Sequence, residues 1–160
     1  MPSPFDLVFQ KGGFFKSLSR EETVDRLNPL AEQLTRLNNG YETVAARLIA
    51  TGDAGMFAFA DRIKADQRFA RMDVGKLNET IFSNGGTAYN GTSLEPGQIA
   101  LPAEPADFTA EMQRREQAHL NDLNETLKLD HQIRSQAILG NLVTHSEERL
   151  RTLDDMSRTF

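Results

Sequence analysis

The chain has 160 residues and a formal net charge of −5, and its hydrophobic residues amount to 39%, enough for one core. This balance provides no basic surface for nucleic acid, and no apolar run of about 18 residues is present to span a membrane. Because cysteine is absent, disulfides and thiolate sites are excluded, and a cytoplasmic location is favoured. No signal peptide is predicted, since the first residues lack a continuous apolar segment.

Residues 1–18 are predicted to form an N-terminal arm that precedes a single helical-bundle domain at residues 19–160. Four phenylalanines lie among the proline, glycine and lysine residues of this arm: Phe5, Phe9, Phe14 and Phe15. Because four exposed rings are unfavourable in water, we expect the arm to pack against the bundle or a second subunit. The expected assembly is a homodimer.

The first helix is predicted to begin near Ser19, because Ser19-Arg-Glu-Glu22 has the pattern of a capping box. Asn28-Pro29 offers a second start, and the sequence leaves open whether Pro29 kinks one helix or separates two. Apolar residues then recur at alternating spacings of three and four, which is typical of a bundle seam. These residues are Leu27, Leu30, Leu34, Leu37, Tyr41, Val44 and Leu48.

A second helix is predicted from about Ala54 to Ser83, between Gly52-Asp53 and the stop signal Asn84-Gly85-Gly86. Its predicted inward residues are Met56, Ala60, Ile63, Ala70, Val74, Leu77 and Ile81. Gln67 is the polar residue on that seam, and three phenylalanines are predicted to widen the apolar face: Phe57, Phe59 and Phe69. Residues 85–106 are rich in Gly, Pro, Ser and Thr and have no helical period. They are predicted to form one long connection.

Two further helices are predicted, one from about Phe108 to Lys128 and one from an Asp130 cap to about Met156. Their seams are Leu120, Leu123 and Leu127 in the first, and Leu139, Leu142, Leu153 and Met156 in the second. The three connections are therefore short, long and short. At about 3.3 Å per residue the long one can run past a helix of about 45 Å, so we predict an all-α, antiparallel four-helix bundle with a crossover.

Three stretches, in this order, resemble the ferritin-like superfamily, and within it small uncharacterised bacterial four-helix-bundle proteins. They read LTRLNNGYETVAARL, FADRIKADQRFARMDVGKLNETIFSNGG and LVTHSEERLRTLDDM. The resemblance covers about residues 20–156. It implies the ferritin-like connectivity and is compatible with a dimer, but it implies no particular activity.

Glu116-x-x-His119, and the reversed His145-x-x-Glu148, are candidate metal-binding motifs. A carboxylate and an imidazole three residues apart project from one helix face, and ferritin-like carboxylate proteins repeat this unit to hold two irons. If the long connection is a crossover, the two motifs lie at one height along the bundle. The candidate ligands for iron or manganese are Glu116, His119, His145 and Asp66.

The positions of these residues on their helices favour a structural alternative. Glu116 lies on a seam, whereas both histidines flank theirs, so fewer carboxylates converge than a di-iron site requires. Arg149 also places a cation where metal charge would lie. We therefore predict that Glu116 pairs with Arg149 and that no cofactor is bound. The predicted buried polar layer consists of Tyr41, Gln67, Glu116 and Arg149.

The leading functional interpretation is a self-associating bundle protein without enzymatic activity. The alternatives are a metal-binding ferritin-like protein and an adaptor that binds a helix of another protein. No catalytic residues are predicted, because three histidines support no defensible Ser-His-Asp arrangement. His131, which follows Asp130 at a predicted helix start, is expected at the surface.

Overall fold

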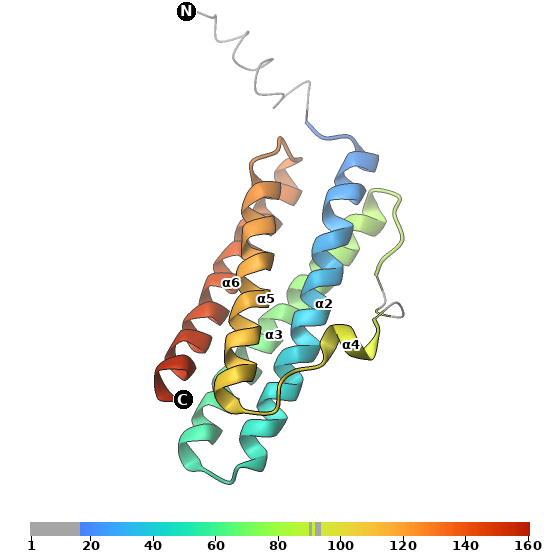
Figure 1. The fold of residues 1–160 in the computed structure, drawn as a ribbon. Helices are drawn as coiled ribbons and strands as arrows, with labels where there is room; N and C mark the ends of the chain where they lie inside the picture. Colours follow the sequence, from blue (N-terminus) through green and yellow to red (C-terminus); the bar gives the residue numbers. More distant parts are fainter. Residues whose placement is uncertain (1–16, 90, 92–93) are drawn as a thin grey trace, which may run out of the picture.

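The computed structural model describes residues 17–89, 91 and 94–160, and this part of the chain is helical without strands (Figure 1). The helices are α2 (Arg20–Ala50), α3 (Ala54–Ser83), α4 (Pro96–Ile99), α5 (Pro105–Leu127) and α6 (Ile133–Thr159). The predicted arm lies outside the described residues, apart from Ser17 and Leu18. No helix in the described part is long and apolar enough to cross a bilayer.

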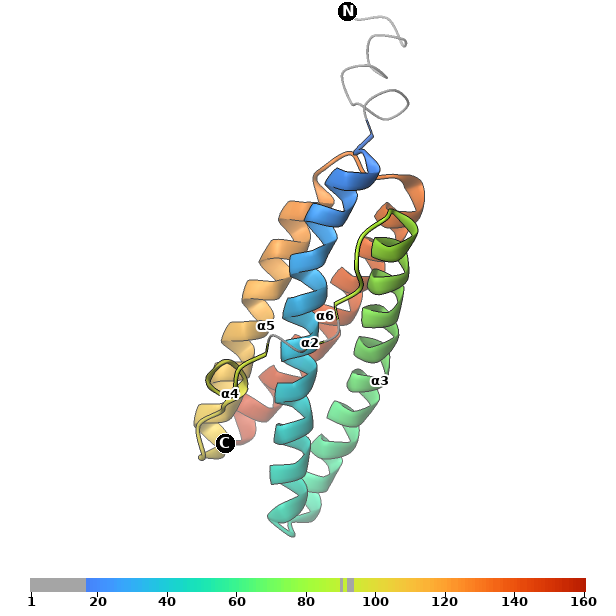
Figure 2. The same cartoon turned by 90° about the vertical axis from the view of Figure 1, so that its right-hand side faces the viewer.

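The four long helices form an antiparallel bundle of two hairpins. α2 and α3 form the first hairpin, α5 and α6 form the second, and the hairpins pack through α2 against α5 and α3 against α6. Between the hairpins the chain returns along the bundle from the end of α3 to the start of α5, at the opposite end (Figures 1 and 2). The predicted all-α fold with a crossover is therefore confirmed.

Helix α2 begins where the capping box predicts. The hydroxyl of Ser19 accepts a hydrogen bond from the Glu22 amide at 3.1 Å, and the Glu22 carboxylate accepts one from the Ser19 amide at 3.2 Å. Pro29 lies inside an uninterrupted helix, so it neither starts nor separates a helix. The predicted seam is buried throughout, from Leu27 to Leu48.

Helix α3 has the predicted boundaries. Asp53 caps its start by accepting hydrogen bonds from the amides of Gly55 and Met56 at 2.8 and 3.2 Å. Its end is followed by Gly85, whose φ of +88° favours glycine, and by Gly86. A Cβ added at Gly86 would lie 2.6 Å from a methyl group of Val24, so the chain leaves α3 in close contact with α2.

Three predictions for the second half of the chain are wrong in detail. The long connection contains the short helix α4, and α5 begins at Pro105, because proline suits the first helical position. Asp130 does not cap α6, which starts after Gln132; the Asp130 carbonyl instead accepts from the Leu18 amide at 2.7 Å.

His131 is also misplaced by the sequence prediction, since it is only 8% exposed. Its Nε2 lies 2.6 Å from the Thr126 carbonyl, so the imidazole closes the turn between α5 and α6. Phe57 and Phe69 do not widen the buried face of α3, because they lie outside its core stripe and are 40% and 50% exposed. Phe59 is partly buried and packs against the core, where its ring is 6.3 Å from that of Phe160.

Candidate functional site

A buried cluster of three side chains lies at the centre of the bundle. Glu116 on α5, Arg149 on α6 and Tyr41 on α2 are each no more than 1% exposed. Arg149 Nε donates to Glu116 Oε1, and Arg149 Nη2 lies 3.5 Å from Oε2. The Tyr41 hydroxyl donates to Glu116 Oε1 at 3.2 Å. One carboxylate therefore joins three of the four long helices.

Burial dominates the electrostatics of this cluster. It raises the pKa of Glu116, and the adjacent Arg149 guanidinium partly offsets that rise. Burial and the Glu116 carboxylate together raise the pKa of Tyr41 well above its ordinary value, so the phenol keeps its proton and donates. Burial also disfavours the charge on Arg149, but the attraction of its neighbours, Glu116 foremost, together outweighs burial and raises the pKa of Arg149.

Gln67, the fourth residue of the predicted polar layer, has a different partner. It is 3% exposed, and its amide nitrogen donates to the carbonyl oxygen and side-chain oxygen of Asn38, at 3.2 and 3.4 Å. Gln67 therefore fixes α3 to α2 rather than bonding to Glu116 or Arg149.

The four candidate metal ligands have separate partners. Glu116 is bonded to Arg149, and Asp66, whose pKa is raised by burial, accepts from the Thr152 hydroxyl at 2.8 Å. His119 bonds to α2, whereas His145 bonds to α3. The described residues contain no group of three or more His, Asp or Glu side chains that could hold a metal ion.

His145 is held by Asp73, which the sequence analysis did not single out. Asp73 is 0% exposed, and its Oδ2 lies 2.6 Å from His145 Nδ1. The Phe69 ring packs on the imidazole with the centroids 5.0 Å apart. The signal was present in the sequence, because Asp73 is three residues after Ala70 and four before Leu77, both of which are buried.

His119 is a neutral imidazole with a defined tautomer. Burial and the positive charge of Arg149 lower its pKa to about 3. Its Nδ1 lies 2.8 Å from the Gln33 side-chain oxygen, and the Gln33 nitrogen donates to Asp122 at 2.6 Å. Because Asp122 fixes the Gln33 amide, Nδ1 must carry the proton and Nε2 is left as an acceptor.

This donor set does not fit the di-iron centre that ferritin-like carboxylate proteins hold. Both oxygens of Glu116 face the Arg149 guanidinium, and a metal ion would have to displace that cation from a buried position. The two histidines are turned toward opposite interfaces of the bundle. The centre is therefore chemically suited to joining helices.

Comparison with known proteins gives a match at the level of fold. No protein-family model matches the chain, and no curated protein matches its sequence. Among solved structures, it is similar to a point mutant of Dps1 from Mycobacterium smegmatis, with a TM-score of 0.65 and 15% identity. The match covers 88% of this chain and 99% of that one. The chain therefore has a ferritin-like four-helix-bundle fold.

Proposed function

We propose that this chain is a ferritin-like bundle protein without a di-iron centre, and that it acts by self-association rather than catalysis. The observation that carries the proposal is the environment of Glu116. This fully buried carboxylate is bonded to Arg149 and Tyr41, the groups expected of a structural network. An iron-binding bundle would instead present several carboxylates to one point.

A buried ion pair is costly to desolvate, and apolar residues in its place are often as stable. Its value lies in geometry, because each partner left alone would be a buried, uncompensated charge. We infer that the cluster fixes the relative height and rotation of α2, α5 and α6. Tyr41 takes part because its hydroxyl reaches the same carboxylate oxygen as Arg149 Nε.

Self-association is supported by the outward face of α3. Six large apolar side chains are exposed in the described part of the chain, and four of them lie on this helix. These four are Phe57, Phe69, Met72 and Phe82, which are 40%, 50%, 55% and 74% exposed. Apolar side chains gathered on one face are typical of an interface, and we propose a homodimer that pairs through α3.

The mass of the full chain in solution tests this assembly. Light scattering over a range of protein concentrations should give the mass of a dimer, and Met72→Glu should shift it toward the monomer. Ile133→Glu is the matched control, because Ile133 is 90% exposed but lies on α6. A monomer at every concentration would contradict self-association and favour an adaptor for another protein's helix.

Metal binding remains the second candidate because of the geometry of His145. A buried carboxylate on Nδ1 is the arrangement that orients histidine ligands in many metal sites. His145 also lines a hollow of about 310 Å³ together with Asp66 and Glu148. Elemental analysis of protein purified without a histidine tag separates the candidates. Stoichiometric iron, manganese or zinc that is lost in His145→Ala would overturn the proposal.

A further inference from the structure

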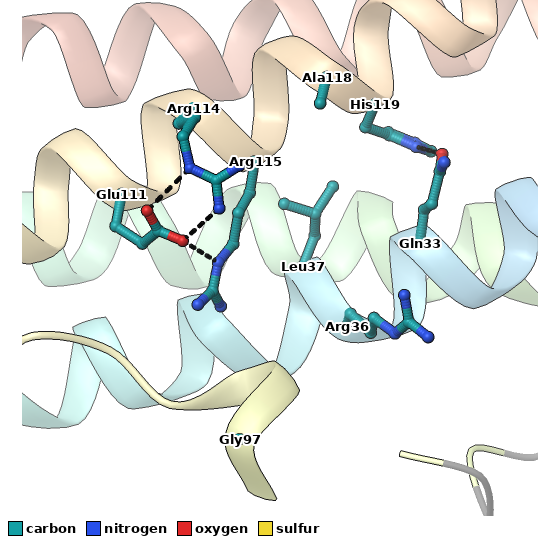
Figure 3. Close-up of a pocket in the computed structure, with 9 residues that line it drawn as sticks. All are labelled: Gln33, Arg36, Leu37, Gly97, Glu111, Arg114, Arg115, Ala118 and His119. Atoms are coloured by element: carbon teal, nitrogen blue, oxygen red, sulfur yellow. Dashed lines mark hydrogen bonds and ion pairs between the residues drawn. The ribbon is translucent and has the colours of Figure 1, made fainter. Parts of the chain in front are cut away.

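A hollow of about 410 Å³ lies between α2, α4 and α5, apart from the central cluster. Arg115 enters it from α5 and Arg36 from α2, on either side of Leu37, with Gly97 of α4 below them (Figure 3). His119 and Arg114 also line it. A volume of this size is within the range of small-molecule sites.

The charge of the hollow is opposite to that of the whole chain. Arg114 donates to Glu111 from two nitrogens, at 2.9 and 2.6 Å, and Arg115 Nε donates to the same carboxylate at 2.8 Å. Hydrogen bonds from these arginines lower the pKa of Glu111 to about 2, so it stays ionised. Three arginines and one carboxylate, Glu111, line the hollow, and Arg36 is also paired with Glu32, whereas the chain carries a net charge of −5.

Three polar atoms of residues that line this hollow are closed to solvent and have no hydrogen-bond partner in the described structure. They are Arg36 Nε, Arg115 Nη1 and His119 Nε2. A buried donor or acceptor without a partner is costly, and it calls for a physical explanation. The two guanidinium groups offer N–H donors, whereas the fixed tautomer of His119 offers an acceptor.

We propose that this hollow binds a small phosphorylated polyol, such as a sugar phosphate. The two arginine side chains turn toward the ligand when it binds, and the phosphate oxygens accept from their N–H groups. Phosphate suits this pair because it combines negative charge with several acceptor oxygens. A hydroxyl of the ligand donates to His119 Nε2. The carbon skeleton lies against Leu37 and Ala118, which supply the apolar part of the lining.

Calorimetric titration of the full chain with glucose 6-phosphate, inorganic phosphate and glucose tests both halves of this ligand. Glucose 6-phosphate should bind about tenfold more tightly than inorganic phosphate, and glucose should not bind measurably. Arg36→Gln and Arg115→Gln should each weaken glucose 6-phosphate about tenfold or more. Arg134→Gln is the matched control, because Arg134 is exposed and paired with Glu79 on α3, outside the hollow. It should change the affinity less than about twofold.

Gly97 allows a second test that leaves the core untouched. A Cβ at Gly97 meets no atom within 4 Å, so side chains fit there without a clash. Gly97→Asp should weaken binding strongly, whereas the uncharged Gly97→Asn should retain it. The proposal would be overturned if glucose 6-phosphate did not bind, or if any two of the three probes bound with equal affinity. It would also be overturned if Arg134→Gln weakened binding as much as the two hollow variants, or if Gly97→Asp and Gly97→Asn weakened it equally.

Discussion

Lowering the pH should destabilise this protein through His119. The imidazole is 1% exposed and its pKa is lowered from 6.5 to about 3 by burial and by Arg149. As the pH falls below 6.5, the unfolded chain takes up this proton and the folded chain does not. The free energy of unfolding contributed by a neutral His119 is therefore intact above pH 6.5 and is lost progressively toward pH 3.

The size of the effect follows from the same pKa values. At pH 5 the solution lies 1.5 units below 6.5, and each unit corresponds to about 1.4 kcal/mol, so the loss is about 2 kcal/mol. Urea unfolding followed by circular dichroism at pH 7 and pH 5 measures it. His119→Asn, which keeps an N–H near Gln33, should lose about 2 kcal/mol less than the native chain over this interval.

The protonation of the His119 imidazole can be followed directly by NMR, which separates its contribution from those of other titrating groups. The ring-proton resonance of His119 should not shift between pH 8 and pH 5 if the folded imidazole stays neutral. A normal titration near pH 6.5, or an unchanged pH dependence in His119→Asn, would refute the reasoning from burial.

Three pairs of substitutions test the packing. Arg149→Met should cost about 3–5 kcal/mol because it leaves Glu116 buried without its cation, and adding Glu116→Leu should recover most of that loss in urea unfolding. Leu34→Ala should cost about 2–5 kcal/mol at a position that is 0% exposed, whereas Ile133→Ala, at 90% exposure and away from α3, should leave the melting temperature nearly unchanged. Gly86→Ala should cost about 1–3 kcal/mol, because its Cβ would be forced against Val24. Gly75→Ala should stabilise α3 by about 0.5–1 kcal/mol, because the space around Gly75 is open. Equal melting temperatures for the two variants would contradict the observed contact.

The fold was predictable because its signals are local. The capping box at Ser19 and the leucine spacing of α2 depend only on residues a few positions apart, and the structure follows both. The connection lengths then restrict how two hairpins can be joined. The Asp130 cap was predicted wrongly because α6 begins after Gln132, two residues later, and Asp130 lies in the preceding turn. There its carbonyl accepts from the Leu18 amide, a contact between segments that are distant in sequence.

The surroundings of the two flanking histidines were harder to predict. Gln33 is 86 residues from His119, and Asp73 is 72 residues from His145. Which side chain meets a flanking histidine depends on the rotation of each helix about its axis, and seam spacing defines that angle only loosely. The spacing of Asp73 alone places it on the buried face of α3. A carboxylate is unusual at a buried position, however, and only the structure identifies His145 as the partner that explains it.

The crossover also determines how the two halves of the chain recognise each other. Between the hairpins, α2 meets α5 and α3 meets α6, through contacts such as Tyr41 with Glu116 and Asp73 with His145. These are the kinds of contact that two separate polypeptides make, and residues 84–104 keep the hairpins at high effective concentration. A chain cut within this connection should therefore reassemble from its two fragments. By the same geometry, two intact copies can exchange hairpins and form an intertwined dimer whose internal contacts are those of the monomer.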